Sequence, residues 1–514
     1  MNIRLPKTMT LRVLSQSCAA LALTLAAQHS AHAVINDFTG ALDGHWSNPL
    51  NWSGGLPVNG QDVRIGVTAT PGVEFDVTFA GAGLNSLTLN PATFHIPVTL
   101  NQNNIGTAMI ATTETIGTDD VATYNQNNGT NNAGTLIAGA LASGTGTYNL
   151  SGVGVLNAGV ESIAASGVAT FNLTGGTNVV GGTLRIGVNA GSTGTYNMAA
   201  GSLIAVAEVI AASGTGTFNQ TGGTNTVTGS LEISSNSGST GIYNMSGGTL
   251  TVNGAGILNK GTINISGGVL GGTGAFTNKG TLNIGGAGTT IANPITNDNG
   301  GHIIVTAPTS FTGHVTNGWG GTFKNTGATA SFPGGFFNGG TFISDPATNL
   351  FSDLAIGTLG IVQGGVGDVF SVSGDLLNES TENTGFDIDA ALVLLDGAGT
   401  HQLTWPGADL GANPAGFADN FAVGIFELAA GGVLDFVSGA LYVSVLDLDG
   451  GLAQAASITG GGRIYYDPAL PENAYLAGGT YAGGIIAPVP EPGAAALIVG
   501  TGALLVGKRR RRSA

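Results

Sequence analysis

The chain has a single cysteine and few charged side chains, which make up 9% of its 514 residues. Because that cysteine, Cys18, lies in the N-terminal segment, the body of the protein has no disulfide, thiol nucleophile or thiolate metal site. Lys, Arg and Glu, which favour helices, are scarce. Glycine numbers 89, and Thr, Asn, Val and Ile abound, which predicts β-strands joined by frequent tight turns. A mean hydropathy of +0.27 is too apolar for a disordered linker.

The N-terminus has the pattern of a secretion signal. Three basic residues precede an apolar stretch at 19–27, and no acidic residue occurs before position 34. The small residues Ala31 and Ala33 then fit the pattern of a signal-peptidase site. We expect residues 1–33 to be a signal peptide with its cleavage site at Ala31 and Ala33; the alternative is a buried N-terminal helix.

The body that follows, residues 34–488, is strongly acidic. It carries 29 Asp and Glu residues against six Lys and Arg, a formal net charge of −23. Such a surface repels phosphate backbones and anionic lipids, which argues against nucleic-acid binding. The shortage of basic residues also argues against catalysis on an anionic polysaccharide, because the substrate needs cations to steady it. We therefore expect a protein that is not an enzyme.

A repeat of 19 to 25 residues organises the body. A Thr-aromatic-Asn-aliphatic unit or a close variant of it recurs around Tyr124, Tyr148, Phe171, Tyr196, Phe218, Tyr243, Ile263 and Leu282. A second strand-like segment, such as Gly-Thr-Leu-Arg-Ile at 182–186, falls between successive units. A unit this short buries little by itself and must stack on its neighbours.

Strand alternation would point the aromatic and aliphatic residues of each unit inward and Thr and Asn outward. The aromatic residues should then form one interior column. The asparagines should form a ladder of side-chain amides that hydrogen-bond from coil to coil, comprising Asn125, Asn149, Asn172, Asn197, Asn219, Asn244, Asn264 and Asn283. We predict an all-β fold, a right-handed parallel β-helix (β-solenoid) of roughly 20 turns; a β-propeller needs repeats of about 40 residues or more.

The strength of the repeat divides the chain into segments. Gly-Gly-Thr-Phe at 320–323 and 339–342 still matches it, so the weaker coils are expected on the same rod. An open end of a β-helix is an unpaired edge, so a cap is required. The predicted segments are a signal peptide (1–33), an N-terminal cap and first coils (34–118), regular coils (119–290), degenerate coils (291–384), a C-terminal β region of closing turns or a small β cap (385–484), and a tail (485–514).

Two tryptophans near the start, Trp46 and Trp52, allow two interpretations. They could form a sugar-stacking platform, or they could cover the first coil as part of a cap. We favour the cap. The five histidines of the body, at positions 45, 95, 302, 314 and 401, are not spaced as metal ligands. We expect no catalytic residue, no cofactor and no metal site.

Two acidic pairs, Asp387/Asp389 and Asp447/Asp449, should each face one side of a strand. Such a pair could bind Ca²⁺ or serve as acid and base in glycan cleavage. Because no basic residue lies near either pair in sequence, we favour solvated acids.

Thr-x-Thr also recurs, at Thr145/Thr147, Thr193/Thr195 and Thr215/Thr217. This pattern resembles the flat threonine ranks of ice-binding solenoids. Intervening coils with Val168 or Ile242 should interrupt the rank, so we do not favour ice binding.

The C-terminal tail has three parts: Pro490-Glu491-Pro492, an apolar run at 494–507, and a basic cluster from Arg509 to Arg512. It resembles the PEP-CTERM sorting signal, and the body resembles the β-helical proteins that carry this tail and the β-helical passengers of autotransporters. The resemblance implies recognition of Pro490, Glu491 and Pro492 by an exosortase, a membrane-embedded transpeptidase-like enzyme of Gram-negative bacteria that commonly make exopolysaccharide.

The same resemblance implies that a basic anchor holds the cytoplasmic end of the tail; it consists of Arg509, Arg510, Arg511 and Arg512. The apolar run is short for a membrane span of about 20 residues. We therefore expect a short apolar helix at 494–507 that contacts the inner membrane only transiently, before cleavage of the tail.

Together these features predict an exported structural or adhesive protein of the cell surface or extracellular matrix. Its expected partners are the secretion machinery, an exosortase-type enzyme and exopolysaccharide. The alternatives are a β-helical enzyme acting on polysaccharide and a protein that binds carbohydrate or ice.

Overall fold

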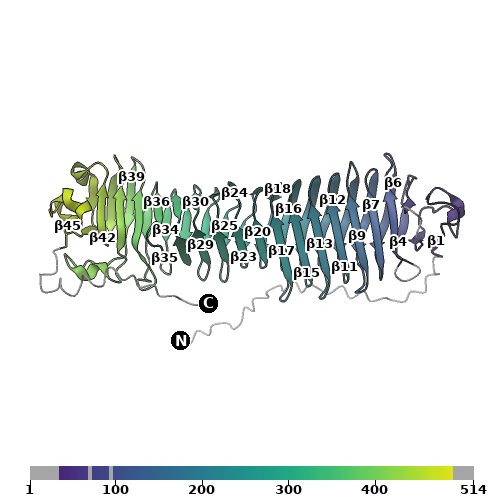
Figure 1. The fold of residues 1–514 in the computed structure, drawn as a ribbon, viewed down its shortest axis with the longest axis horizontal. Coiled ribbons are helices and arrows are strands. Elements are labelled where there is room, and N and C mark those ends of the chain that lie inside the picture. Colours follow the sequence, from purple (N-terminus) through teal and green to yellow (C-terminus); the bar gives the residue numbers. More distant parts are fainter. Residues whose placement is uncertain (1–33, 68–71, 92–95, 490–514) are drawn as a thin grey trace, which may run out of the picture.

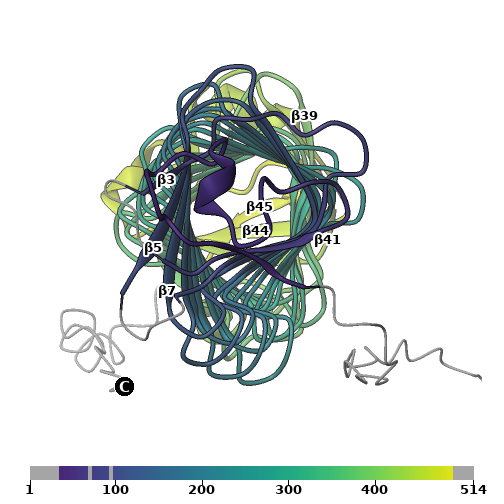
Figure 2. The same ribbon diagram turned by 90° about the vertical axis from the view of Figure 1, so that its right-hand side faces the viewer.

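The computed structural model describes residues 34–67, 72–91 and 96–489 and shows a parallel β-solenoid of about 19 stacked coils. The coils follow one another along a single long axis, from β1 (Asn36–Phe38) at one end to β45 (Ile486–Pro488) at the other (Figure 1). Viewed along that axis, successive coils superimpose and enclose the interior of the rod (Figure 2). The predicted β-solenoid and the estimate of roughly 20 turns are confirmed.

The named strands pair in parallel and form two sheets. Each regular coil gives one six-residue strand to a 14-stranded sheet, here sheet B. The strands of sheet B are β3 (Val73–Glu74), β5 (Val98–Gln102), β7 (Val121–Gln126), β9 (Thr145–Leu150), β11 (Val168–Leu173), β13 (Thr193–Met198), β15 (Thr215–Gln220), β17 (Thr240–Met245), β20 (Thr262–Ile265), β23 (Thr281–Ile284), β26 (His302–Val305), β29 (Thr322–Thr326), β32 (Thr341–Asp345) and β35 (Ile361–Gln363).

Each regular coil also gives a longer, bent strand to a 31-stranded sheet, here sheet A. In the middle of these strands two successive residues, such as Gly159 and Val160, point away from the interior. These two residues mark a bend that divides the strand into a first and a second limb. The long strands are β6 (Ala108–Ile116), β8 (Thr130–Ala138), β10 (Val155–Ile163), β12 (Thr177–Ile186), β14 (Ser202–Ile210) and β16 (Thr224–Ile233). The shorter strands β2 (Asp62–Ile65) and β4 (Leu84–Leu89) precede them in the same sheet.

Beyond β16 the long strand is replaced by two short ones in each coil. These short strands of sheet A are β18 (Thr249–Val252), β19 (Gly256–Asn259), β21 (Val269–Gly271), β22 (Phe276–Asn278), β24 (Thr289–Ile291), β25 (Ile295–Asn297), β27 (Thr309–Phe311), β28 (Val315–Asn317), β30 (Thr329–Phe332), β31 (Phe336–Asn338), β33 (Thr348–Phe351), β34 (Leu354–Ile356), β36 (Val369–Val372) and β37 (Leu376–Asn378).

The last coils continue sheet A after sheet B has ended at β35. The predicted C-terminal β region is thus a set of closing turns on the same rod. Its strands are β38 (Ile388–Leu395), β39 (Thr400–Thr404), β40 (Val423–Leu428), β41 (Val433–Ser438), β42 (Ala440–Leu448), β43 (Ile458–Gly460), β44 (Arg463–Tyr466) and β45. Short 3₁₀ helices lie at the two ends of the rod: η1 (Pro49–Asn51), η2 (Pro414–Phe417), η3 (Leu452–Ser457), η4 (Pro471–Leu476) and η5 (Ala482–Gly484).

The predicted interior column of aromatic rings is present in sheet B. Strand register aligns the rings of successive coils. Each ring is fully buried, and neighbouring ring centroids lie 4.6–5.0 Å apart. The column comprises Tyr124, Tyr148, Phe171, Tyr196, Phe218 and Tyr243.

The predicted ladder of asparagine amides is also present, on the outward side of sheet B. Each amide nitrogen donates to the side-chain oxygen of the asparagine one coil earlier, at 2.7–2.9 Å. The ladder begins one coil before the predicted set, at Asn101, and ends at Asn283.

The weaker coils remain on the rod, as predicted, and Phe323 pairs with Phe342 in sheet B. Their interior contains a second ladder that the sequence analysis missed. Here each amide donates to the asparagine one coil later, at 2.8 Å, and all five members are fully buried: Asn259, Asn278, Asn297, Asn317 and Asn338.

Within the ranges that the structure describes, no helix is long and apolar enough to cross a membrane. Several predictions fall outside those ranges: the signal peptide with Ala31 and Ala33, the motif Pro490 to Pro492, the apolar helix at 494–507 and the basic cluster Arg509 to Arg512.

Candidate functional surfaces

The outward face of sheet B between β5 and β17 carries columns of threonine beside the asparagine ladder. The column nearer the ladder is continuous over six coils, and we call it the threonine column: Thr99, Thr123, Thr147, Thr170, Thr195 and Thr217. Within the described residues the hydroxyls of this column make no side-chain hydrogen bond, whereas the asparagine amides bond to one another. The threonines therefore leave a row of free donors and acceptors at the spacing of the coils.

The predicted interruptions of the Thr-x-Thr rank are present. Strand register places Ile242 next to Thr217 at the end of the threonine column. In the parallel outer column, Val168 lies between Thr145 and Thr193. The outward face of sheet B thus has one continuous column of threonines beside a second column that is interrupted.

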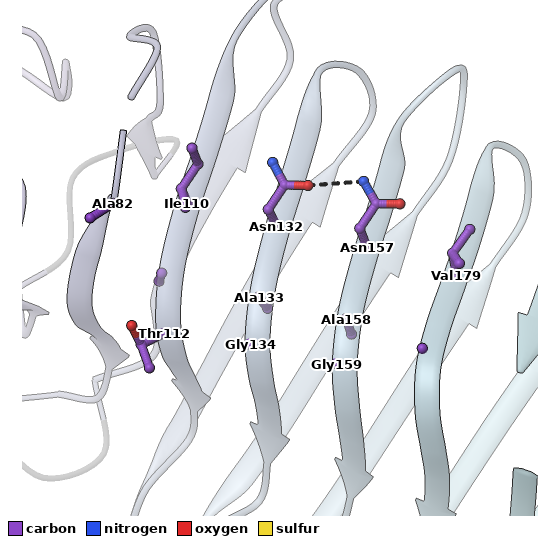
Figure 3. A pocket seen from close by; sticks show the side chains of 12 residues that line it. Ala82, Ile110, Thr112, Asn132, Ala133, Gly134, Asn157, Ala158, Gly159 and Val179 are labelled. Atoms are coloured by element: carbon purple, nitrogen blue, oxygen red, sulfur yellow. Dashed lines mark hydrogen bonds between the residues drawn. The ribbon is translucent and has the colours of Figure 1, made fainter. Parts of the chain in front are cut away.

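A groove of about 520 Å³ lies on the outer side of sheet A, over the first limbs of β6, β8, β10 and β12 (Figure 3). Alanine and glycine make up most of its lining, together with Ile110 and Val179, and some of the glycines lie very close to the neighbouring coil. A Cβ atom on Gly159 would lie 2.4 Å from the carbonyl oxygen of Gly134. The polar groups in the groove include Asn132 and Asn157, whose amides are joined by a 2.9 Å hydrogen bond.

The two N-terminal tryptophans are core residues. Trp46 is fully buried and Trp52 is 5% exposed, with ring centroids 4.6 Å apart. The indole nitrogen of Trp52 donates to the carbonyl oxygen of Trp46 at 2.8 Å, and Trp46 packs edge-on against Phe75. The sugar-stacking interpretation is therefore wrong, and the cap interpretation is confirmed.

The acids of the C-terminal coils do gather in one place. Asp447 and Asp449 line a groove of about 450 Å³ together with Glu472 and Tyr475. Glu427 is the strand partner of Asp447. Partial burial, followed by the charges of Asp449 and Asp447, raises the pKa of Glu427; partial burial and Asp449 raise the pKa of Asp447.

The other predicted pair, Asp387 and Asp389, lies at the start of β38. Burial and the neighbouring Asp389 carboxylate raise the pKa of Asp387. Among the described residues, no group of three or more His, Cys, Asp or Glu side chains is placed to hold a metal ion. The histidines of the described chain are dispersed: His401, for example, is buried and its ring nitrogen bonds to the carbonyl oxygen of Gly374.

Three buried glutamates were missed by the sequence analysis. Glu114, Glu161 and Glu208 point into the rod from β6, β10 and β14, and each is at most 1% exposed. Each accepts a hydrogen bond from an asparagine that follows it by 17 residues, at 2.8–3.2 Å: Asn131, Asn178 and Asn225. In the sequence these glutamates recur every 47 residues, which is the length of two coils, so a search for a one-coil repeat does not find them.

Fold and surface together define a parallel β-solenoid rod with long outward ladders of hydroxyl and amide groups. Comparison of the chain with protein-family models, with curated proteins and with solved structures finds no match.

Proposed function

We propose that this chain is an exported, non-enzymatic structural and adhesive protein of the cell surface or extracellular matrix. The observation that carries the proposal is the threonine column with its adjoining amide ladder, a polar surface that repeats once per coil along a straight rod. A repeating row of hydroxyl donors and acceptors suits a long neutral polymer better than a small molecule. We propose exopolysaccharide as that polymer.

The charge of the chain supports this assignment. The body carries a net charge of −23, so the rod repels nucleic acids and other polyanions. The outward ladders carry no charge and offer a surface on which neutral sugar hydroxyls can hydrogen-bond. An example is the asparagine ladder from Asn149 to Asn197, which lies beside the threonines from Thr147 to Thr195.

Binding of the full chain to the neutral exopolysaccharide of a producing strain tests the proposal. We expect the triple variant Thr147→Val/Thr170→Val/Thr195→Val to lose at least tenfold in affinity, because Val preserves the β-branched shape but removes the hydroxyl. The matched control is Thr277→Val/Thr296→Val/Thr316→Val on the aligned outward positions of sheet A. Equal binding by the wild type and both variants would exclude the threonine column as the adhesive surface.

Sorting by an exosortase is proposed from the resemblance of the tail. Cell fractionation with and without the sorting enzyme tests it. We expect the full-length chain to remain in the inner membrane only in cells that lack the enzyme; release that is unchanged in both strains would contradict the proposal.

A second candidate function is glycan cleavage in the acidic C-terminal groove. One observation favours it: the pKa values of Glu427 and Asp447, beside the 450 Å³ groove, are raised. Glycosidases use a protonated carboxyl next to an ionised one, and a raised pKa favours the protonated form. Release of reducing ends from neutral polysaccharide by the wild type, and its loss in Glu427→Gln, would establish this function in place of the first.

A further inference from the structure

The interior of the regular coils alternates between two compositions. In sheet A, the position of Glu161 is occupied by Leu136 in the coil before and by Leu184 in the coil after. The position of Asn178 is likewise flanked by Leu156 and Leu203. Coils with a leucine and a glutamate therefore alternate with coils that have an asparagine and a leucine at the same two positions, and each polar contact joins the glutamate of one coil to the asparagine of the next.

The hydrogen bonds of these asparagines leave two oxygen atoms without partners at each site. Both hydrogens of the Asn131 amide are used, one by Oε2 of Glu114 at 2.8 Å and one by the hydroxyl of Tyr148 at 3.0 Å. The Tyr148 hydroxyl in turn donates to Gln126. Oε1 of the glutamate and Oδ1 of the asparagine then have no donor, and the same two atoms are left without one at the sites of Glu161 and Glu208.

Two buried acceptors without a donor are costly, and a buried carboxylate without a cation is costlier still. The titratable groups that face the three glutamates are the tyrosines of the aromatic column and the glutamates of neighbouring sites. None of these is a cation. A single proton on the carboxyl removes the charge and supplies the missing donor.

We propose that each buried glutamate is a neutral carboxylic acid that pairs bidentately with its asparagine, the proton on Oε1 donating to the amide Oδ1. The three acid–amide pairs lock the alternating coils in register and make this part of the rod sensitive to alkaline pH.

The electrostatics agree with the geometry. Burial raises the pKa of Glu114 and Glu208 to about 7 and of Glu161 to about 8, from 4.5, although the asparagine hydrogen bond opposes the rise. The folded protein thus binds these protons more tightly than the unfolded chain. Their contribution to stability is complete below pH 4.5 and is lost as the pH rises through 7 to 8.

Infrared spectroscopy of the full chain tests the protonation directly. We expect the carbonyl stretch of a protonated carboxylic acid at pH 6, with a D₂O shift, and its disappearance by pH 9.5. Glu114→Gln/Glu161→Gln/Glu208→Gln should remove the band, whereas the control Glu232→Gln, at a half-buried outward position paired with Lys260, should keep it. Absence of the band from the wild type at pH 6 would overturn the proposal.

Thermal unfolding provides the second readout. Because a Gln amide can donate to Oδ1 and accept from Nδ2 as the protonated acid does, the triple Gln variant should melt at the wild-type temperature at pH 5. At pH 9 it should melt at a higher temperature than the wild type. Equal melting temperatures of the two proteins at pH 9 would contradict the proposal.

Discussion

Phe171 and Tyr196 stack inside the rod with their ring planes 4° apart and their centroids 4.6 Å apart. The two rings occupy equivalent positions in successive coils, yet only the tyrosine has a polar partner. Its hydroxyl accepts a hydrogen bond from Asn178 at 3.1 Å. Next to Phe171, the position equivalent to Asn178 is occupied by Leu156, which offers no hydrogen bond. From Tyr148 to Tyr243 the choice between Phe and Tyr therefore follows the two-coil alternation, whereas Tyr124, one coil earlier, donates its hydroxyl to Gln102 instead.

Phe171→Tyr should destabilise the rod by about 1–3 kcal/mol, because the added hydroxyl is buried without the amide that Tyr148 and Tyr196 use. Adding Leu156→Asn should recover part of that loss. Denaturant unfolding of the wild type, both single variants and the double variant gives the coupling energy. Additive effects of the two changes would show that the alternation has no energetic role.

The sequence was sufficient to predict the aromatic column and the outer asparagine ladder for one physical reason. In both, a residue of one kind recurs in every coil, so a repeat of 19 to 25 residues reveals it. Glu161 and Asn178 escaped notice because they recur only in alternate coils. The inner ladder from Asn259 to Asn338 escaped because buried amides are uncommon, and composition alone places asparagine outside. The acidic groove around Asp447 depends on the closing turns, whose register has no repeat to predict it.

The two asparagine ladders should respond differently to the same substitution. Asn172→Asp on the outer ladder still accepts from Asn197 but cannot donate to Asn149, which costs about 1 kcal/mol. Asn297→Asp on the inner ladder buries a carboxyl and should cost about 3 kcal/mol or more at neutral pH. Denaturant unfolding at pH 7 measures both, and equal losses would contradict the assigned burial.

Two glycines of the sheet A groove form a matched pair for testing the close approach of coils. A Cβ atom on Gly159 would lie 2.4 Å from a carbonyl oxygen, whereas on Gly181 the nearest atom would lie at 3.7 Å. Gly159→Ala should destabilise the rod by about 1–3 kcal/mol and Gly181→Ala by less than about 0.5 kcal/mol. Denaturant midpoints of the two variants measure the difference, and equal midpoints would show that the coils can separate at no cost.

Tryptophan fluorescence offers a test of the cap. Trp46, Trp52 and Trp405 are buried, whereas Trp319 is 66% exposed. Acrylamide should therefore quench only one of the four tryptophans efficiently, and Trp319→Phe should abolish that accessible fraction. Strong quenching in Trp319→Phe would indicate that Trp46 and Trp52 are open to solvent, as the sugar-platform interpretation requires.

The acidic groove predicts a substitution that stabilises the protein. The pKa of Asp447 is raised by partial burial and by Asp449, so its carboxyl opposes folding where it is ionised. For a raised carboxyl pKa, stability is greatest below the unfolded value and falls as the pH rises through the folded value. Asp447→Asn should therefore melt at a higher temperature than the wild type at pH 7 and at the same temperature at pH 3.

The gain should be small, below about 1 kcal/mol, because Asp447 is only partly buried and remains largely exposed, so that solvent screens its charge. High salt should reduce the gain further, because it weakens the repulsion from Asp449. Asp435→Asn, on β41 outside the lining of the groove, is the control and should leave the melting temperature unchanged. A decrease in the stability of Asp447→Asn at pH 7 would mean that the carboxylate has a favourable partner, such as a bound cation, in the groove.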